Sequence, residues 1–145
     1  MDWNKDKSLA LSRAAVAVFA AALAALLATA PWFWRAVLHR DGICWLYLVV
    51  TYLTGAPAAA VLWQLHRLLK NIGAGQAFTA SNVAALRLIS WCCILAAAVY
   101  FGAGFFDWYL FVFAVVAAFV GLVLRVVKNV FAQAVALKEE NDYTI

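Results

Sequence analysis

Four long apolar runs, separated by short polar stretches, make up most of the chain. The runs cover residues 9–30, 43–63, 83–105 and 108–128. Each is close to the ~20 residues that a helix needs to cross ~30 Å of hydrocarbon. The apolar residues are continuous rather than alternating, which disfavours a membrane β-barrel. The pattern therefore predicts an all-α, integral membrane four-helix bundle that forms one domain over residues 1–145.

The most strongly patterned polar stretch lies between the second and third runs, at residues 64–82. Its apolar residues recur with helical spacing among polar ones, at Leu65, Leu68, Leu69 and Ile72. This spacing predicts an amphipathic helix lying on a membrane surface or against a partner helix. Gly73 predicts the end of that helix. Thr79 predicts the start of the next one, with Asn82 three residues on as a relative of the capping box. We therefore expect an inner amphipathic hinge here.

Two prolines mark expected breaks in the helices. Pro31 ends the first run, and residues 31–42 are predicted to form an outer loop. Pro57 lies inside the second run, where it removes a backbone donor and clashes with the carbonyl group of Leu53. A kink is expected there, with a nearby threonine hydroxyl satisfying the freed carbonyl group. A broken helix can also create an ion site, but only threonines supply polar side chains at this point.

The first run has an alternative interpretation as a cleaved signal peptide. A basic start precedes it, and residues 28–30 form a small-residue cleavage motif. We favour a retained span, because Pro31 directly after the motif hinders cleavage. Alanines that repeat every four residues in this run are also typical of closely packed membrane helices. The intact mass of the purified protein distinguishes the two interpretations.

Composition and charge place the chain in a lipid bilayer and orient it. The chain is 68% hydrophobic and 12% charged, whereas soluble chains are roughly 45–50% apolar and about 25% charged. Of 11 basic residues, all but Arg35 and Arg40 fall on one side of a four-span arrangement. The positive-inside rule predicts cytoplasmic termini and a multi-pass protein of the bacterial cytoplasmic membrane. The basic charge is too sparse to indicate direct nucleic-acid binding.

The C-terminal part, residues 129–145, is predicted to extend the fourth helix into the cytoplasm. A 3–4 spaced apolar stripe continues past the fourth span, and an acidic tail follows. We hypothesise that an acid of the tail folds back toward a basic residue of the hinge or of the third helix. The residues assigned to partner binding or to the hinge are Arg67, Lys70, Asn71, Phe78, Thr79, Asn82, Arg87, Glu139, Glu140 and Asp142.

Aromatic residues crowd the opposite, outer edge. They are Trp32, Phe33, Trp34, Trp45, Tyr47, Tyr100, Phe101, Phe105, Phe106, Trp108 and Tyr109. An aromatic belt is typical of a membrane interface, and a binding surface for an apolar ligand or peptide is the alternative. The three cysteines are expected to be packing residues. No metal site, cofactor or catalytic site is expected, because ligand spacing, a phosphate-binding loop and an acid–base pair are all missing from the sequence.

Two motifs resemble a known family. The first is Leu68-Leu69-Lys70-Asn71-Ile72 followed by Gln76-Ala77-Phe78-Thr79, Asn82 and Leu86-Arg87, and the second is the acidic end of the chain at residues 137–145. They are similar to small bacterial four-span membrane proteins catalogued as a domain of unknown function. Members are often encoded beside a Cro/CI-type helix-turn-helix regulator. Ala77 departs from the family, in which proline is common at this position.

The sequence favours a non-enzymatic regulatory or sensor protein that acts through its cytoplasmic hinge and tail. The resemblance implies a cytoplasmic helix-turn-helix regulator as a partner. The alternative is an oligomeric small-molecule transporter or channel, in which the chain forms a homo-oligomer. Every Asp and Glu lies in a loop or terminus, so the membrane-embedded carboxylate used by small proton-coupled exporters has no counterpart here.

Overall fold

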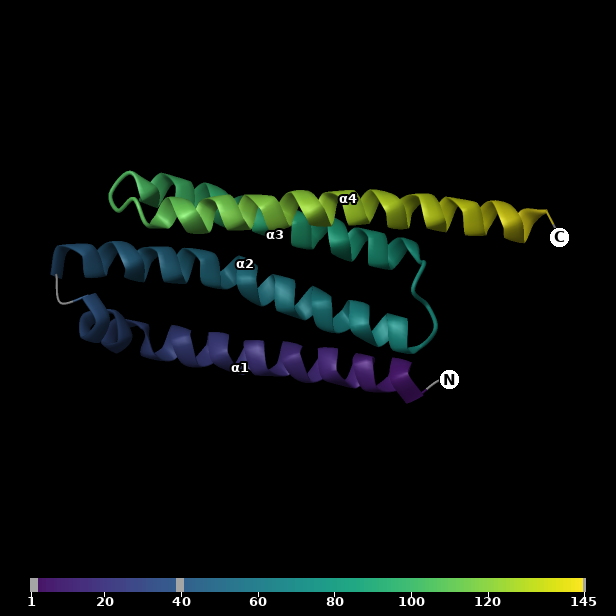
Figure 1. Ribbon diagram of the computed structural model, residues 1–145, viewed down its shortest axis with the longest axis horizontal. Helices are drawn as coiled ribbons and strands as arrows, with labels where there is room; N and C mark the ends of the chain where they lie inside the picture. The colour runs from purple at the N-terminus through teal and green to yellow at the C-terminus, as the bar shows by residue number, and fades with distance from the viewer. Residues whose placement is uncertain (1–2, 39–40, 145) are drawn as a thin grey trace.

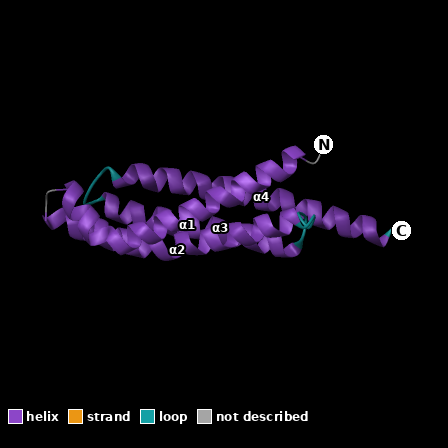
Figure 2. Ribbon diagram, turned by 90° about the horizontal axis from the view of Figure 1, so that it is seen from below, coloured by secondary structure: helices purple, strands orange, loops and turns teal. Residues whose placement is uncertain are grey.

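Four helices make up nearly all of the computed structural model, which describes residues 3–38 and 41–144 (Figure 1). They are α1 (Trp3–Leu38), α2 (Asp41–Gly73), α3 (Ala80–Gly104) and α4 (Leu110–Tyr143). All four are long and apolar enough to cross a membrane, and the described residues form no strand (Figure 2). The predicted all-α four-helix bundle is confirmed, and the chain is a small multi-pass membrane protein.

The helices pack in chain order. α1 packs on α2, α2 on α3, and α3 on α4, with the most extensive contact between α3 and α4. Within the described helices, the α1 backbone approaches no helix other than α2. The tight turn after α3 forces α3 and α4 to lie antiparallel as neighbours (Figure 1). Since α1 and α4 are not in backbone contact, space for a groove is left between them.

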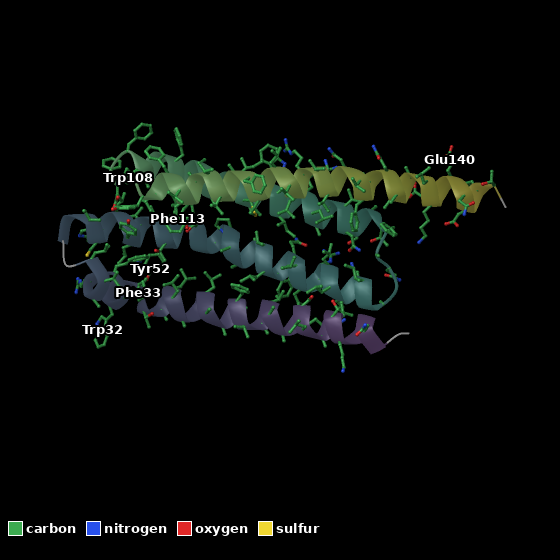
Figure 3. All side chains as sticks on the ribbon, viewed as in Figure 1. Trp32, Phe33, Tyr52, Trp108, Phe113 and Glu140 are labelled. Atoms are coloured by element: carbon green, nitrogen blue, oxygen red, sulfur yellow. The ribbon has the colours of Figure 1, made fainter. Side chains whose placement is uncertain are left out.

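The two ends of the molecule differ in chemistry, and we name them accordingly. The α2–α3 turn, the start of α1 and the end of α4 lie at one end, the basic end (Figure 1). The α3–α4 turn, the end of α1 and the start of α2 lie at the other, the aromatic end (Figure 1). Trp32, Phe33 and Trp108 lie at the aromatic end (Figure 3).

Pro31 does not end α1, so the predicted outer loop at residues 31–42 is wrong for residues 31–38 and 41–42, which are helical; residues 39–40 lie outside the described part of the chain. α1 continues through Pro31 to Leu38. A proline inside a helix removes the hydrogen bond to the carbonyl group four residues earlier, here that of Leu27. The Tyr52 hydroxyl of α2 donates to this Leu27 carbonyl oxygen at 3.0 Å. A side chain of the neighbouring helix thus replaces the bond that proline cannot make.

Pro57 is likewise accommodated inside one continuous helix, and α2 changes direction near its middle (Figure 1). The expectation that a threonine hydroxyl satisfies the carbonyl group of Leu53 is wrong. The Thr51 hydroxyl donates to the Tyr47 carbonyl oxygen at 2.7 Å, and the Thr54 hydroxyl donates to that of Val50 at 2.8 Å. Both bonds run one turn back along the helix, as serine and threonine commonly do in helices.

The amphipathic stretch before the turn forms the last turns of α2 rather than a separate surface helix. Leu68 is buried in a cluster with Ala85 and Leu86 of α3, and Ile72 packs against the same cluster. The apolar stripe therefore faces the neighbouring helices rather than a membrane surface. The predicted boundary between the second span and the hinge is therefore not a helix end. The second span and the first half of residues 64–82 form one helix, α2.

Gly75, not Gly73, has the left-handed backbone that ends α2. Its φ is 75°, while Gly73 is still helical. The Gln76 amide donates to the Asn71 carbonyl oxygen at 2.9 Å, and the Gly75 amide donates to that of Ile72 at 3.0 Å. This pair of bonds is the Schellman motif, which requires a left-handed residue one position before its end. The sequence offered two glycines, and the hydrogen-bond geometry selects the second.

Candidate functional site

The turn at the basic end is built around the side chain of Asn82, which is fully buried. Its amide nitrogen donates to the carbonyl oxygens of Gln76 and Ala77 at 2.9 and 2.8 Å, and its amide oxygen accepts from Asn71 Nδ2 at 2.8 Å. Thr79 caps α3 as predicted, since its hydroxyl accepts from the Asn82 backbone amide at 3.4 Å. Asn82 does not make the reciprocal bond of a capping box; it fixes the loop instead.

Two further contacts hold this turn in place. Arg67 donates to the Ser81 hydroxyl at 3.2 Å, which links the last turns of α2 to the first turn of α3. The ring centres of Phe78 and Phe131 are 5.3 Å apart, which joins the turn to α4. Asn71, Phe78, Thr79 and Asn82 are thus brought together as a fixed structural unit. These contacts tie the turn to α2, α3 and α4, and the polar side chain at its centre is satisfied by hydrogen bonds.

The other basic residues near this end are exposed. Lys70 and Arg87 are exposed and bind no acidic residue of the described chain. Arg125 lies over the ring of Trp91, with its guanidinium carbon 5.0 Å from the ring centre. A cation–π contact of this kind stabilises a charge beside an apolar helix face.

The acidic tail does not fold back onto the basic residues, so the predicted docking is absent from the structure. α4 is one helix to Tyr143, and Glu139, Glu140 and Asp142 are exposed on it. The last turns of α4 project beyond the α2–α3 turn (Figure 1), and Glu140 lies on this projecting part (Figure 3). The Thr144 hydroxyl donates to the Glu140 carbonyl oxygen at 2.8 Å, which caps the helix end.

A groove of about 690 Å³ lies between the helices, and side chains from all four line it; we call it the four-helix groove. Its volume falls within the ~300–1,000 Å³ of small-molecule sites. The lining comprises Phe19, Ala22, Leu23, Leu26, Trp34, Tyr47, Val50, Thr51, Thr54, Gly55, Pro57, Ala58, Val61, Leu62, Cys92, Cys93, Ala96, Tyr100, Leu110, Phe113, Ala117 and Val120. None of these residues is Asp, Glu, Lys, Arg or His, so the groove suits an apolar molecule.

Polar groups are concentrated toward the aromatic end of this groove. The Tyr47 hydroxyl donates to Asp107 Oδ2 at 2.9 Å. Trp34 Nε1 donates to the Thr51 hydroxyl at 2.9 Å. An apolar site with a few polar groups at one end is the arrangement expected for an amphiphile, whose tail and head need different surroundings.

Sequence reasoning identified the aromatic end but missed the groove below it. The signal was the distribution of small side chains: Gly55, Ala58, Ala96 and Ala117 stand on three different helices and all line the groove. Small residues on facing helices leave space wherever the backbones do not close up. Which of them face one another depends on helix rotation, and the sequence does not fix that rotation.

The side chains that could ligate a metal ion are dispersed in the described part of the chain. No three His, Cys, Asp or Glu residues of the described chain lie close enough together to hold a metal ion. Cys92 and Cys93 line the four-helix groove as free thiols. The arrangement is able to bind an apolar molecule and to present helix surfaces, which are binding functions.

Comparison with known proteins gives one match. A family model described as "Protein of unknown function (DUF2975)" matches residues 36–145. No curated protein and no solved structure matches the chain. The matched region takes in α2, α3 and α4 entirely but only the last residues of α1.

Proposed function

The chain belongs to the DUF2975 family of proteins of unknown function, and from this premise we propose that it is a non-enzymatic, membrane-embedded regulatory or sensor protein. The observation that carries the proposal is the course of α4. This one helix lines the four-helix groove, contacts the α2–α3 turn through Phe131 and Phe78, and then projects beyond the bundle (Figure 1). A ligand bound in the four-helix groove and a partner protein bound to the projecting end of α4 would thus both contact α4.

The projecting part of α4 carries an uncovered apolar stripe. Val127 packs against the buried cluster of α2 and α3. The same stripe continues through Val130, Ala134 and Leu137, and Val130 and Leu137 are 58% and 66% exposed. Residues 132–143 add about 18 Å of helix beyond Phe131. An amphipathic helix with an open apolar face fits the groove of a partner protein.

The projection is proposed to lie in the bacterial cytoplasm. Arg67, Lys70 and Arg87 are exposed at the same end, and the positive-inside rule places such an end on the cytoplasmic side. A cytoplasmic helix-turn-helix regulator is the partner that we propose. The α2–α3 turn, whose Phe78 packs on Phe131, would support α4 at the point where the helix extends beyond the bundle.

The test is in-cell crosslinking with a photoreactive residue at position 137, followed by co-purification with the product of the adjacent gene. Leu137→Glu is expected to reduce co-purification at least tenfold, because it places a charge in the apolar contact. Ala132→Glu, on the opposite side of the same helix, is the matched control and should have little effect. Equal effects of the two substitutions, or no cytoplasmic partner at all, would contradict the proposal.

An oligomeric small-molecule transporter or channel is the second candidate, and the four-helix groove is the observation that favours it. No Asp, Glu, His, Lys or Arg side chain lines the groove, so the membrane-embedded carboxylate that couples protons in small exporters has no counterpart there. Flux of an uncharged apolar molecule into proteoliposomes would distinguish the candidates. Transport that persists without any cytoplasmic protein would favour the transporter.

A further inference from the structure

A second groove, of about 450 Å³, lies between α1 and α2 on the side of the basic end; we call it the α1–α2 groove. Side chains of α1 pack closely on two glycines of α2. A Cβ atom at Gly55 would lie 2.7 Å from Leu27, and one at Gly73 would lie 2.5 Å from Arg13 Nη2 and 2.8 Å from Leu9. The groove lies between these two contacts, along residues 13–27 of α1 and 59–66 of α2.

The lining is apolar except at one end. Along α1 it is formed mostly by alanine, leucine and valine, and along α2 it includes Ala59, Leu62 and Trp63. The exceptions are Arg13 and His66, which are the lining residues nearest the start of α1 and the end of α2 and so belong to the side of the basic end. Charge and apolar surface are therefore separated along the groove, as they are along a phospholipid.

Arg13 has donors available for an anion. Both Arg13 and His66 are exposed. The Arg13 guanidinium donates to the Leu69 carbonyl oxygen at 3.5 Å, which is a long and therefore weak hydrogen bond. A guanidinium group carries five N–H donors, and their fork geometry matches a phosphate group.

We propose that the α1–α2 groove binds one anionic phospholipid from the leaflet at the basic end. Its phosphate binds Arg13 and His66, and one acyl chain lies along the alanines of α1. The groove runs from residue 13 to residue 27 of α1, about 21 Å of helix. That length exceeds the ~15 Å depth of one leaflet's hydrocarbon, so a whole acyl chain fits along it.

A second copy of the chain is a poorer occupant. Membrane helices often associate through small residues such as these alanines. In a two-fold dimer formed through this groove, however, the two Arg13 side chains would face each other at the same depth. Like charges brought together in this way repel, whereas a phosphate neutralises the arginine.

The experiment is native mass spectrometry of the full chain titrated with phosphatidylglycerol or with phosphatidylcholine of the same acyl chains. The chain is expected to bind one phosphatidylglycerol at least tenfold more tightly than phosphatidylcholine. R13Q combined with H66Q should abolish this preference. R87Q removes an exposed arginine outside the groove and should keep it. Equal affinity for the two lipids, or an equal loss in R87Q, would overturn the proposal.

A second pair of variants tests the groove independently of charge. Ala20→Leu fills it and should weaken binding of both lipids at least tenfold. Ala21→Leu, on the next residue of α1 and outside the lining, should not. Competition by inorganic phosphate as strong as that by the lipid would overturn the acyl-chain contact. A dimer mass that Ala20→Leu abolishes would assign the groove to a second copy instead and would also overturn the proposal.

Discussion

At the residue scale, two polar side chains supply bonds that the backbone lacks. Asn82 satisfies two loop carbonyl groups and accepts a bond from Asn71. Tyr52 satisfies the Leu27 carbonyl group that Pro31 leaves without its helical donor. A buried backbone carbonyl group without a partner is destabilising. These two side chains therefore stabilise backbone conformations that lack their usual hydrogen bonds.

The bond between Tyr52 and Leu27 gives a residue-scale prediction. Tyr52→Phe should destabilise the protein by about 0.6 kcal/mol, which is the average for a hydrogen bond between membrane helices. In the Pro31→Ala background the cost of Tyr52→Phe should nearly vanish, because alanine restores an amide that donates to Leu27. Unfolding in denaturing detergent measures both values. An equal cost in the two backgrounds would show that Tyr52 does not replace the missing amide.

At the element scale, the helices are longer than the hydrophobic spans that the sequence marks out. Two prolines lie inside helices, and α4 continues through its polar tail to Tyr143. Helix ends are set where a specific cap forms: the Schellman motif at Gly75, Thr79 at the start of α3, and Thr144 at the end of α4. Hydrophobic length alone does not determine where a membrane helix ends.

The cap at Gly75 gives an element-scale prediction. Gly75→Ala should destabilise the protein by about 1 kcal/mol, because an L-residue is strained at positive φ. Gly102→Ala is the matched control: Gly102 lies in α3, and a Cβ atom there would meet nothing within 4 Å. Alanine should be neutral or slightly stabilising at that position. Detergent unfolding of both variants provides the measurement. A neutral Gly75→Ala would argue against the left-handed cap.

At the scale of the whole molecule, packing in chain order produces the two grooves. α1 rests on α2 alone, so one face of α1 and one of α4 remain open. The four-helix groove and the α1–α2 groove both depend on this arrangement. The α2–α3 turn and the projecting end of α4 lie at the opposite end of the molecule from Trp32, Phe33 and Trp108 (Figure 1, Figure 3).

This two-ended arrangement gives a whole-molecule prediction. In a chain whose native cysteines are replaced by alanine, single cysteines at positions 75 and 142 should react with a membrane-impermeant maleimide only after the cells are permeabilised. A cysteine at position 106, in the α3–α4 turn, should react in intact cells. Labelling of positions 75 and 142 from opposite sides would be incompatible with the fold.

The sequence by itself determined the class of the protein and the chemistry of its ends. Four apolar runs specify four spanning helices, because hydrophobic length is a local property. Thr79 was identifiable as a cap, because capping depends on a few neighbouring residues. The position of Asn82 at the turn was also evident, although its bonds to Gln76 and Ala77 were not.

Only the tertiary structure decided what depends on residues far apart in the chain. α1 continues through Pro31, and Tyr52 of another helix donates to the Leu27 carbonyl oxygen that proline leaves without its helical donor. The stripe around Leu68 faces α3 rather than lipid, and the acidic tail continues α4 instead of returning to Arg67. Both grooves exist because helix rotations bring small side chains to face one another. Such rotations are set by packing between helices, and a periodic pattern within one helix does not specify its partner.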